Sequence, residues 1–172
     1  MHIERPAPSE YAPFYQKYVD RVAGGEDLIG LLRRQPAALR AVLAAIGEDR
    51  ADYRYAPGKW SVKESVGHML DTERVFAYRA LRIGRGDATP LPGFDQDAYV
   101  PHDNLEGRTL ASLADAFERL RAANLDLFEH FDAAALGRTG TASEHPVSVR
   151  ALLYIVAGHA EHHLRILEER YR

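Results

Sequence analysis

The chain contains no cysteine among its 172 residues. It therefore forms no disulfide, and any metal would have to be held by histidine, aspartate or glutamate side chains. A reaction that depends on a thiol would have to take that thiol from a small-molecule partner, because the protein has none of its own.

Other features that mark common functions are also missing. The formal net charge of −3 provides no basic surface for nucleic acid. No apolar run approaches the ~20 residues that a membrane span needs, and the first residues lack the pattern of a secretory signal. The sequence has no glycine-rich phosphate loop, nucleophile elbow or zincin motif. These absences favour a cytoplasmic protein with no nucleic-acid or membrane partner.

Four long segments carry apolar side chains at helical spacing. They are residues 26–46, 61–85, 109–131 and 149–171. Because no segment alternates apolar and polar residues as a strand would, the sequence predicts an all-α four-helix bundle. The connections at residues 52–60, 87–107 and 132–146 are expected to be loops.

Local signals set the ends of these helices. Ser61 and Glu64 form the pattern of a capping box, and Ser148 is placed to cap the last helix. Pro36 is expected to kink or restart the first helix, because proline lacks the N–H that a helix interior uses.

The start of the chain differs from the rest. Residues 1–24 contain three prolines among aromatic residues, which predicts an extended arm with at most a short helical piece. The arm could wrap the core of its own chain or a partner subunit. Residues 25–172 are expected to form one bundle domain.

The last helical segment carries two histidines within its apolar stripe. Its inward face comprises Leu152, Ile155, Val156, His159, His163, Ile166 and Leu167. Imidazoles at positions i and i+4 point to the same side of a helix, and neutral imidazole is the commonest metal ligand in proteins. His68, on the 61–85 helix, is a third candidate ligand. His162 also shares a face with His159, and the spacing alone prefers neither His162 nor His163.

Three histidines without a fourth protein ligand indicate a catalytic rather than a structural metal site. The free coordination position would let a divalent metal activate a substrate oxygen, a water or a thiol. Three imidazoles suit zinc, nickel, iron and copper alike.

Several polar residues are weaker candidates. Arg79 lies on the His68 face and could reach an anionic substrate or a buried carboxylate, and Asn124 interrupts the apolar stripe of the third helix. The simpler interpretation of Asn124 is an interhelical hydrogen bond, and the functional one is that it orients a ligand or substrate. Asp95, Asp97 and Tyr99, in the loop at residues 87–107, are candidates for substrate contacts.

Three stretches together resemble the DinB/YfiT-like superfamily. They are Tyr55-Ala-Pro-Gly-Lys-Trp-Ser-Val-Lys-Glu-Ser-Val-Gly-His68, the following Asp71-Thr-Glu-Arg-Val-Phe-Ala-Tyr-Arg-Ala-Leu-Arg, and Gly158-His-Ala-Glu-His-His163. The resemblance extends from about Leu28 to the C-terminus. It implies a bundle of up-down-down-up topology, often dimeric, with a divalent zinc, nickel or iron ion held by His68, His159 and His163.

The same resemblance suggests the chemistry. Characterised relatives include transferases that use low-molecular-weight thiols such as bacillithiol, and mycothiol-dependent isomerases. The leading hypothesis is therefore a metal-dependent, thiol-dependent S-transferase acting on a small-molecule substrate. The alternatives are a metal-dependent hydrolase and a non-catalytic, metal-braced stress-response module that binds a partner or forms a homodimer.

Overall fold

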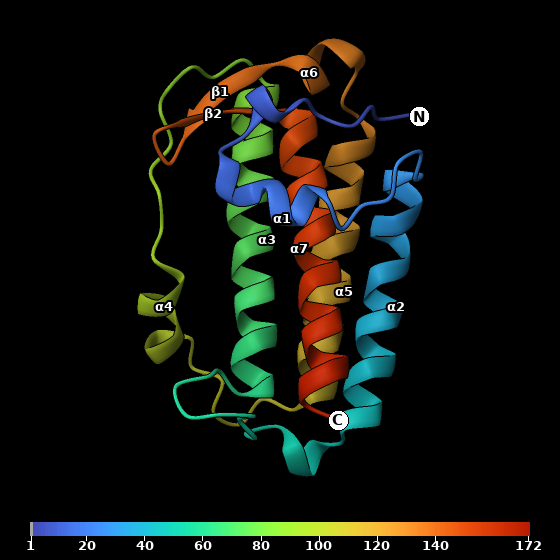
Figure 1. Ribbon diagram of the computed structural model, residues 1–172, viewed down its shortest axis with the longest axis vertical. Coiled ribbons are helices and arrows are strands. Elements are labelled where there is room, and N and C mark those ends of the chain that lie inside the picture. The colour runs from blue at the N-terminus through green and yellow to red at the C-terminus, as the bar shows by residue number, and fades with distance from the viewer. Residues whose placement is uncertain (1) are drawn as a thin grey trace.

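The computed structural model describes residues 2–172, and its dominant feature is a bundle of four long helices (Figure 1). The helices are α1 (Gln16–Val19), α2 (Leu28–Ile46), α3 (Val62–Gly84), α4 (Gln96–Tyr99), α5 (Leu110–Glu129), α6 (Ala133–Gly137) and α7 (Val149–Arg170). The strands are β1 (Thr139–Ala142) and β2 (His145–Ser148). Within the described chain, no helix combines the length and apolar character needed to cross a membrane.

The bundle has the up-down-down-up topology. Helices α2 and α7 run in one direction, and α3 and α5 run in the other (Figure 1). Each of α2 and α3 packs against both α5 and α7. Because α3 and α5 are parallel, the chain between them (residues 85–109, the crossover segment) travels along the outside of the bundle from one end to the other (Figure 1).

The helix starts follow the capping signals in the sequence. The Ser61 side chain accepts from the Glu64 backbone N–H, and the Glu64 carboxylate accepts from the Ser61 N–H, which completes the predicted capping box. Ser148 accepts from the Ala151 N–H and caps α7 as predicted. These bonds satisfy backbone donors that would otherwise lack a partner in the first helical turn.

Pro36 does not restart the first helix, because α2 runs through this residue without interruption. A proline at position 36 leaves the carbonyl of Leu32, four residues earlier, without its helical donor. Arg121 on α5 supplies the missing bond, since its Nη1 lies 2.8 Å from the Leu32 oxygen. A buried side chain of a neighbouring helix thus removes part of the cost of the proline.

The loop predicted at residues 132–146 is also wrong in part, because it contains α6 and most of a two-stranded hairpin. Strands β1 and β2 pair antiparallel, with Thr139 opposite Ser148 and Ala142 opposite His145. Ala142 also forms a bridge with Leu91, so the hairpin anchors the start of the crossover segment. Ser143 and Glu144, at its turn, adopt positive φ values of 52° and 67°.

The N-terminal arm folds back onto its own bundle. Helix α1 packs on α7, and Arg150 of α7 holds Glu10 with bonds of 2.6 and 2.7 Å. These bonds hold the pKa of the Glu10 carboxyl down at about 2. At Gly158 the arm approaches so closely that an added Cβ would lie 1.9 Å from the carbonyl oxygen of Tyr18. Glycine is therefore required at this position of α7.

Gly158→Ala is expected to lower the free energy of unfolding by roughly 2 kcal/mol, which is the usual cost of overpacking. This reverses the normal effect, because alanine in a helix interior is about 1 kcal/mol better than glycine. The added methyl group would meet backbone atoms of Tyr18, which cannot rotate away as a side chain could. Urea denaturation followed by circular dichroism would measure the change.

Gly30→Ala is the matched control for this prediction. Gly30 also lies inside a helix, but the atoms nearest to its added Cβ belong to the Asp27 and Arg34 side chains, which can rotate away as a backbone cannot. We expect Gly30→Ala to leave stability unchanged or to raise it. An equal gain in stability from Gly158→Ala would show that α1 does not pack on α7 in solution.

Candidate metal centre

Three histidines from two helices converge inside the bundle. His68 comes from α3, and His159 and His163 come from successive turns of α7, which packs directly against α3. All three side chains are buried. One ring nitrogen from each lies within 4.8 Å of the others. The structure therefore brings together the three histidines that the sequence singled out.

The closest pair of nitrogens comes from different helices. Nε2 of His68 and Nε2 of His159 lie 2.9 Å apart, and the ring centroids of His159 and His163 lie 4.5 Å apart. The hydroxyl of Thr72 lies 3.4 Å from the His68 ring nitrogens, one turn along α3. The donor set is entirely imidazole nitrogen, which is the set that suits a divalent zinc, nickel or iron ion.

Burial keeps these imidazoles neutral. The pKa of His68 is lowered to about 4, mainly because the side chain is buried away from solvent and to a smaller extent because of the charge of His162. Loss of solvent also lowers the pKa values of His159 and His163 well below the usual value, with smaller contributions from the neighbouring histidines. Neutral imidazoles present free lone pairs at physiological pH, which is the form that binds a metal. The residues present thus fit a divalent cation.

Aromatic side chains hold the histidine rings in place. Trp60 packs on His68 with ring centroids 4.7 Å apart. Tyr18, on the arm, packs its ring at 72° against His159 and at 70° against His162. His162 is half-buried and lies outside the cluster of three, beside His163. The geometry therefore separates His162 from His163, which the helical spacing could not do.

Two cavities reach the histidine cluster from outside. The larger, of about 500 Å³, is called here the aromatic cavity and is bounded by His159 together with Phe14, Tyr15, Tyr18, Phe76 and Phe94. The smaller, of about 270 Å³, is called the polar cavity, and its boundary includes His68, His163, Lys59, Trp60, Ser65 and Asp97. Lys17, Tyr18 and Gln96 line both cavities.

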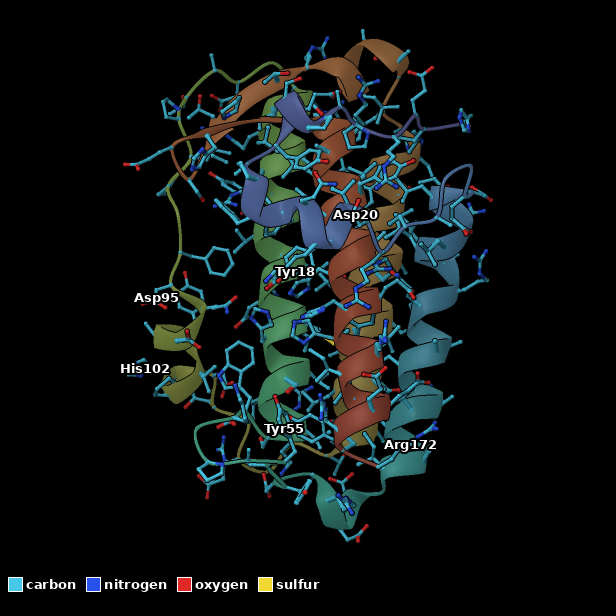
Figure 2. The ribbon with its side chains drawn as sticks, viewed as in Figure 1. Tyr18, Asp20, Tyr55, Asp95, His102 and Arg172 are labelled. Carbon is cyan, nitrogen blue, oxygen red and sulfur yellow. The ribbon has the colours of Figure 1, made fainter. Side chains whose placement is uncertain are left out.

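The arm and the crossover segment thus provide walls of the site. Figure 2 shows Tyr18 over the α3–α7 pair, Asp95 on the crossover segment to one side, and Tyr55 toward the C-terminal end of α7. The sequence analysis missed Lys17 and Tyr18. The only signal for them was an excess of aromatic residues in the arm, which does not specify what the arm covers.

The loop candidates have different positions. Asp95 caps α4 by accepting from the backbone N–H groups of Asp97 and Ala98, and it also lines the aromatic cavity. Asp97 lines the polar cavity beside His163. Tyr99 packs on Phe94, with ring centroids 5.6 Å apart, and lines neither cavity.

Arg79 lies outside both cavities and is buried. Its Nη2 donates to the carbonyl oxygen of Pro92 at 2.8 Å and to the Ser143 hydroxyl at 3.0 Å. These contacts tie the crossover segment and the hairpin turn to α3. In this structure the guanidinium holds the walls of the aromatic cavity rather than facing its interior.

A buried polar network lies behind the cluster. Arg121 makes two bonds to the Glu73 carboxylate, at 2.6 and 2.8 Å, and Asn124 donates to the same carboxylate at 3.2 Å. Asn124 therefore makes the interhelical hydrogen bond of its simpler interpretation. Glu73 therefore pairs with a buried arginine on α5 and not with an arginine of its own helix.

The same network reaches α7 through Gln35. This amide donates to the carbonyl oxygen of Ala157 and to the Glu161 carboxylate, both at 2.8 Å, and accepts from Arg121. Glu161 is half-buried, and its carboxylate accepts this bond. Ala157 lies two residues before His159, and Glu161 lies two residues before His163. The network therefore fixes the part of α7 that carries these two metal-ligand candidates.

The fold and the histidine cluster define the class as a four-helix bundle protein with a candidate metal centre between two helices. The sequence model of the DinB superfamily matches residues 31–167, and the chain belongs to that superfamily. No curated protein matches the chain.

Among solved structures, the chain is similar to YfiT from Bacillus subtilis. The TM-score is 0.75 at 15% sequence identity, and the match covers 96% of this chain and 91% of that chain. YfiT is described as a "probable metal-dependent hydrolase with an unusual four-helix bundle topology". At this identity the similarity establishes the shared fold.

Proposed function

We propose that the protein is a metal-dependent enzyme whose divalent cation is held by His68, His159 and His163. The observation that carries this proposal is the approach of three buried, neutral imidazoles from α3 and α7, with their nitrogens within 4.8 Å. Three imidazoles in a bundle core are costly to bury unless their nitrogens have partners. A divalent cation gives each of them a partner.

Bound there with three protein ligands, a divalent cation supplies Lewis acidity and lowers the pKa of a thiol or a water. The chain's own groups prepare the site for it. Burial keeps the three imidazoles unprotonated, and Trp60 and Tyr18 fix the orientation of the rings. The arm and the crossover segment limit the access of bulk water to the cluster.

The reaction that we infer is S-transfer from a low-molecular-weight thiol to an electrophilic small molecule. The thiol loses its proton to solvent, its sulfur forms a bond to carbon, and the bond from that carbon to the leaving group breaks. The two cavities support this inference, because a two-substrate reaction needs two sites that meet at the activating centre. The absence of cysteine requires that the sulfur come from outside.

Hydrolysis is the second candidate, favoured by the description of YfiT. In this case water replaces the thiol and the leaving group departs from an acyl or related carbon. No new protein residue is needed, because the cation that the same histidines would hold would also lower the pKa of a water.

The test uses untagged protein reconstituted separately with zinc, nickel and ferrous iron. Thioether formation from bacillithiol and monobromobimane, with release of bromide, is compared with hydrolysis of p-nitrophenyl acetate in the absence of thiol. Metal-dependent thioether formation above the solution rate would support S-transfer, and metal-dependent ester hydrolysis alone would support the hydrolase. Metal binding without either reaction would favour a metal-braced binding module, and failure to bind any metal would overturn the proposal.

A further inference from the structure

We propose that the aromatic cavity binds a planar, apolar group of the electrophilic substrate, such as an aromatic ring. This inference rests on the proposed function, because the cavity is useful to the reaction only if the histidine cluster holds a metal. It adds a substrate class to the proposed reaction. The electrophile would place its flat hydrocarbon part in this cavity and its reacting atom next to His159.

The composition of the walls carries the inference. Five aromatic rings from three separate parts of the chain bound the cavity: Phe14, Tyr15 and Tyr18 from the arm, Phe76 from α3, and Phe94 from the crossover segment. Aromatic walls favour aromatic occupants, because rings gain energy from offset or edge-to-face packing in addition to the burial of apolar area. A volume of about 500 Å³ lies within the range of small-molecule sites.

Some rings of the aromatic cavity already pack edge to face against their neighbours. Tyr15 meets Phe76 edge to face, with centroids 5.6 Å apart and an angle of 86°. Tyr18 joins this wall to the metal centre, because its ring also packs against His159 at 5.2 Å. A ring in the cavity would therefore lie next to the proposed metal ligand.

Charged groups also lie at these walls: Lys17 and Asp95 line the cavity, and the buried Arg79 lies outside it. The Arg79 guanidinium lies 5.1 Å from the Phe76 ring centroid and 5.8 Å from that of Phe94, with its donors directed to Pro92 and Ser143. It stabilises the two rings through their π faces, and it does not line the cavity itself. Arg79 is thus a positioning residue for the aromatic walls, and it is the rings of these walls that favour an apolar group.

The polar cavity provides the contrast. Lys59, Ser65 and Asp97 line it together with His68 and His163. Its charged and hydroxyl groups suit a polar thiol. None of the described residues that line it is a phenylalanine, whereas Phe14, Phe76 and Phe94 line the aromatic cavity, and this is how the two sides of the histidine cluster differ.

Isothermal titration calorimetry of the zinc-loaded full chain with two hydroxamates tests the inference. Both probes bind zinc through the same group, and benzohydroxamate carries a phenyl ring where acetohydroxamate carries a methyl group. We expect benzohydroxamate to bind at least tenfold more tightly. In Phe94→Ala, which removes a partly buried ring from the crossover segment, this preference should fall below threefold.

Leu81→Ala is the matched control, because this side chain is exposed on α3 and outside both cavities. It should keep the tenfold preference. Equal affinities for the two probes in the wild type, or an unchanged preference in Phe94→Ala, would overturn the assignment of the aromatic cavity and leave the metal centre intact. A chain that binds no zinc would overturn both proposals.

Discussion

The His159→Ala protein is expected to fold and to carry no metal after purification. His159 contributes a nitrogen 2.9 Å from that of His68, so its loss leaves two imidazoles where three converge. Loss of a group that only orients a ligand costs 10–100-fold in metal affinity, so we expect loss of a ligand to cost at least ~100-fold. Elemental mass spectrometry would measure the metal per chain, and circular dichroism would confirm that the helices remain.

Two other histidine variants are controls that show whether metal loss is specific to the three clustered histidines. His130→Ala removes an exposed imidazole at the end of α5, and His162→Ala removes the half-buried neighbour that lies outside the cluster. Both should keep about one metal per chain, as in the wild type. Equal metal content in His159→Ala and wild type would show that the cluster is not the metal site.

Arg121→Met is expected to lower the free energy of unfolding by roughly 3–5 kcal/mol, the usual result of removing one partner from a buried ion pair. Arg121 and Glu73 have only 1% and 3% of their side chains exposed. Without the guanidinium, the Glu73 carboxylate is buried beside Asn124 alone, and the Leu32 carbonyl freed by Pro36 loses its donor. Urea denaturation would measure the loss.

A double variant separates the charge from the packing. Adding Glu73→Gln to Arg121→Met removes the uncompensated carboxylate, so we expect the double variant to be more stable than Arg121→Met alone. Arg119→Met is the surface control, because this arginine is exposed on the same helix and should change stability by less than about 0.5 kcal/mol. A similarly small effect of Arg121→Met would show that the network contributes little to stability.

The parts of the fold that follow from local chemistry were predictable from the sequence. The four long helices follow from apolar periodicity, and the start of α3 follows from the Ser61–Glu64 capping box. The pairing of His159 and His163 on one face follows from their spacing along α7. That His68 meets them depends on which helices pack together, and here the family resemblance supplied what periodicity could not.

The features that escaped prediction depend on partners distant in sequence. Helix α2 continues through Pro36 because Arg121, 89 residues beyond Leu32, supplies a donor to the freed carbonyl. The hairpin of β1 and β2 is short, and its pairing with the crossover segment through Leu91 leaves no alternating pattern to detect. The docking of the arm depends on a missing side chain at Gly158, and helix propensity treats that glycine only as a cost.

The metal-ligand candidates and the cavity walls belong to different parts of the chain. The ligands lie on α3 and α7, which pack against each other, whereas much of the walls comes from the arm and the crossover segment. Substitutions in these connecting segments can reshape the cavities without moving the two helices, because loops tolerate changes that packed helices do not. The same set of three histidines can therefore be combined with cavities of different shape.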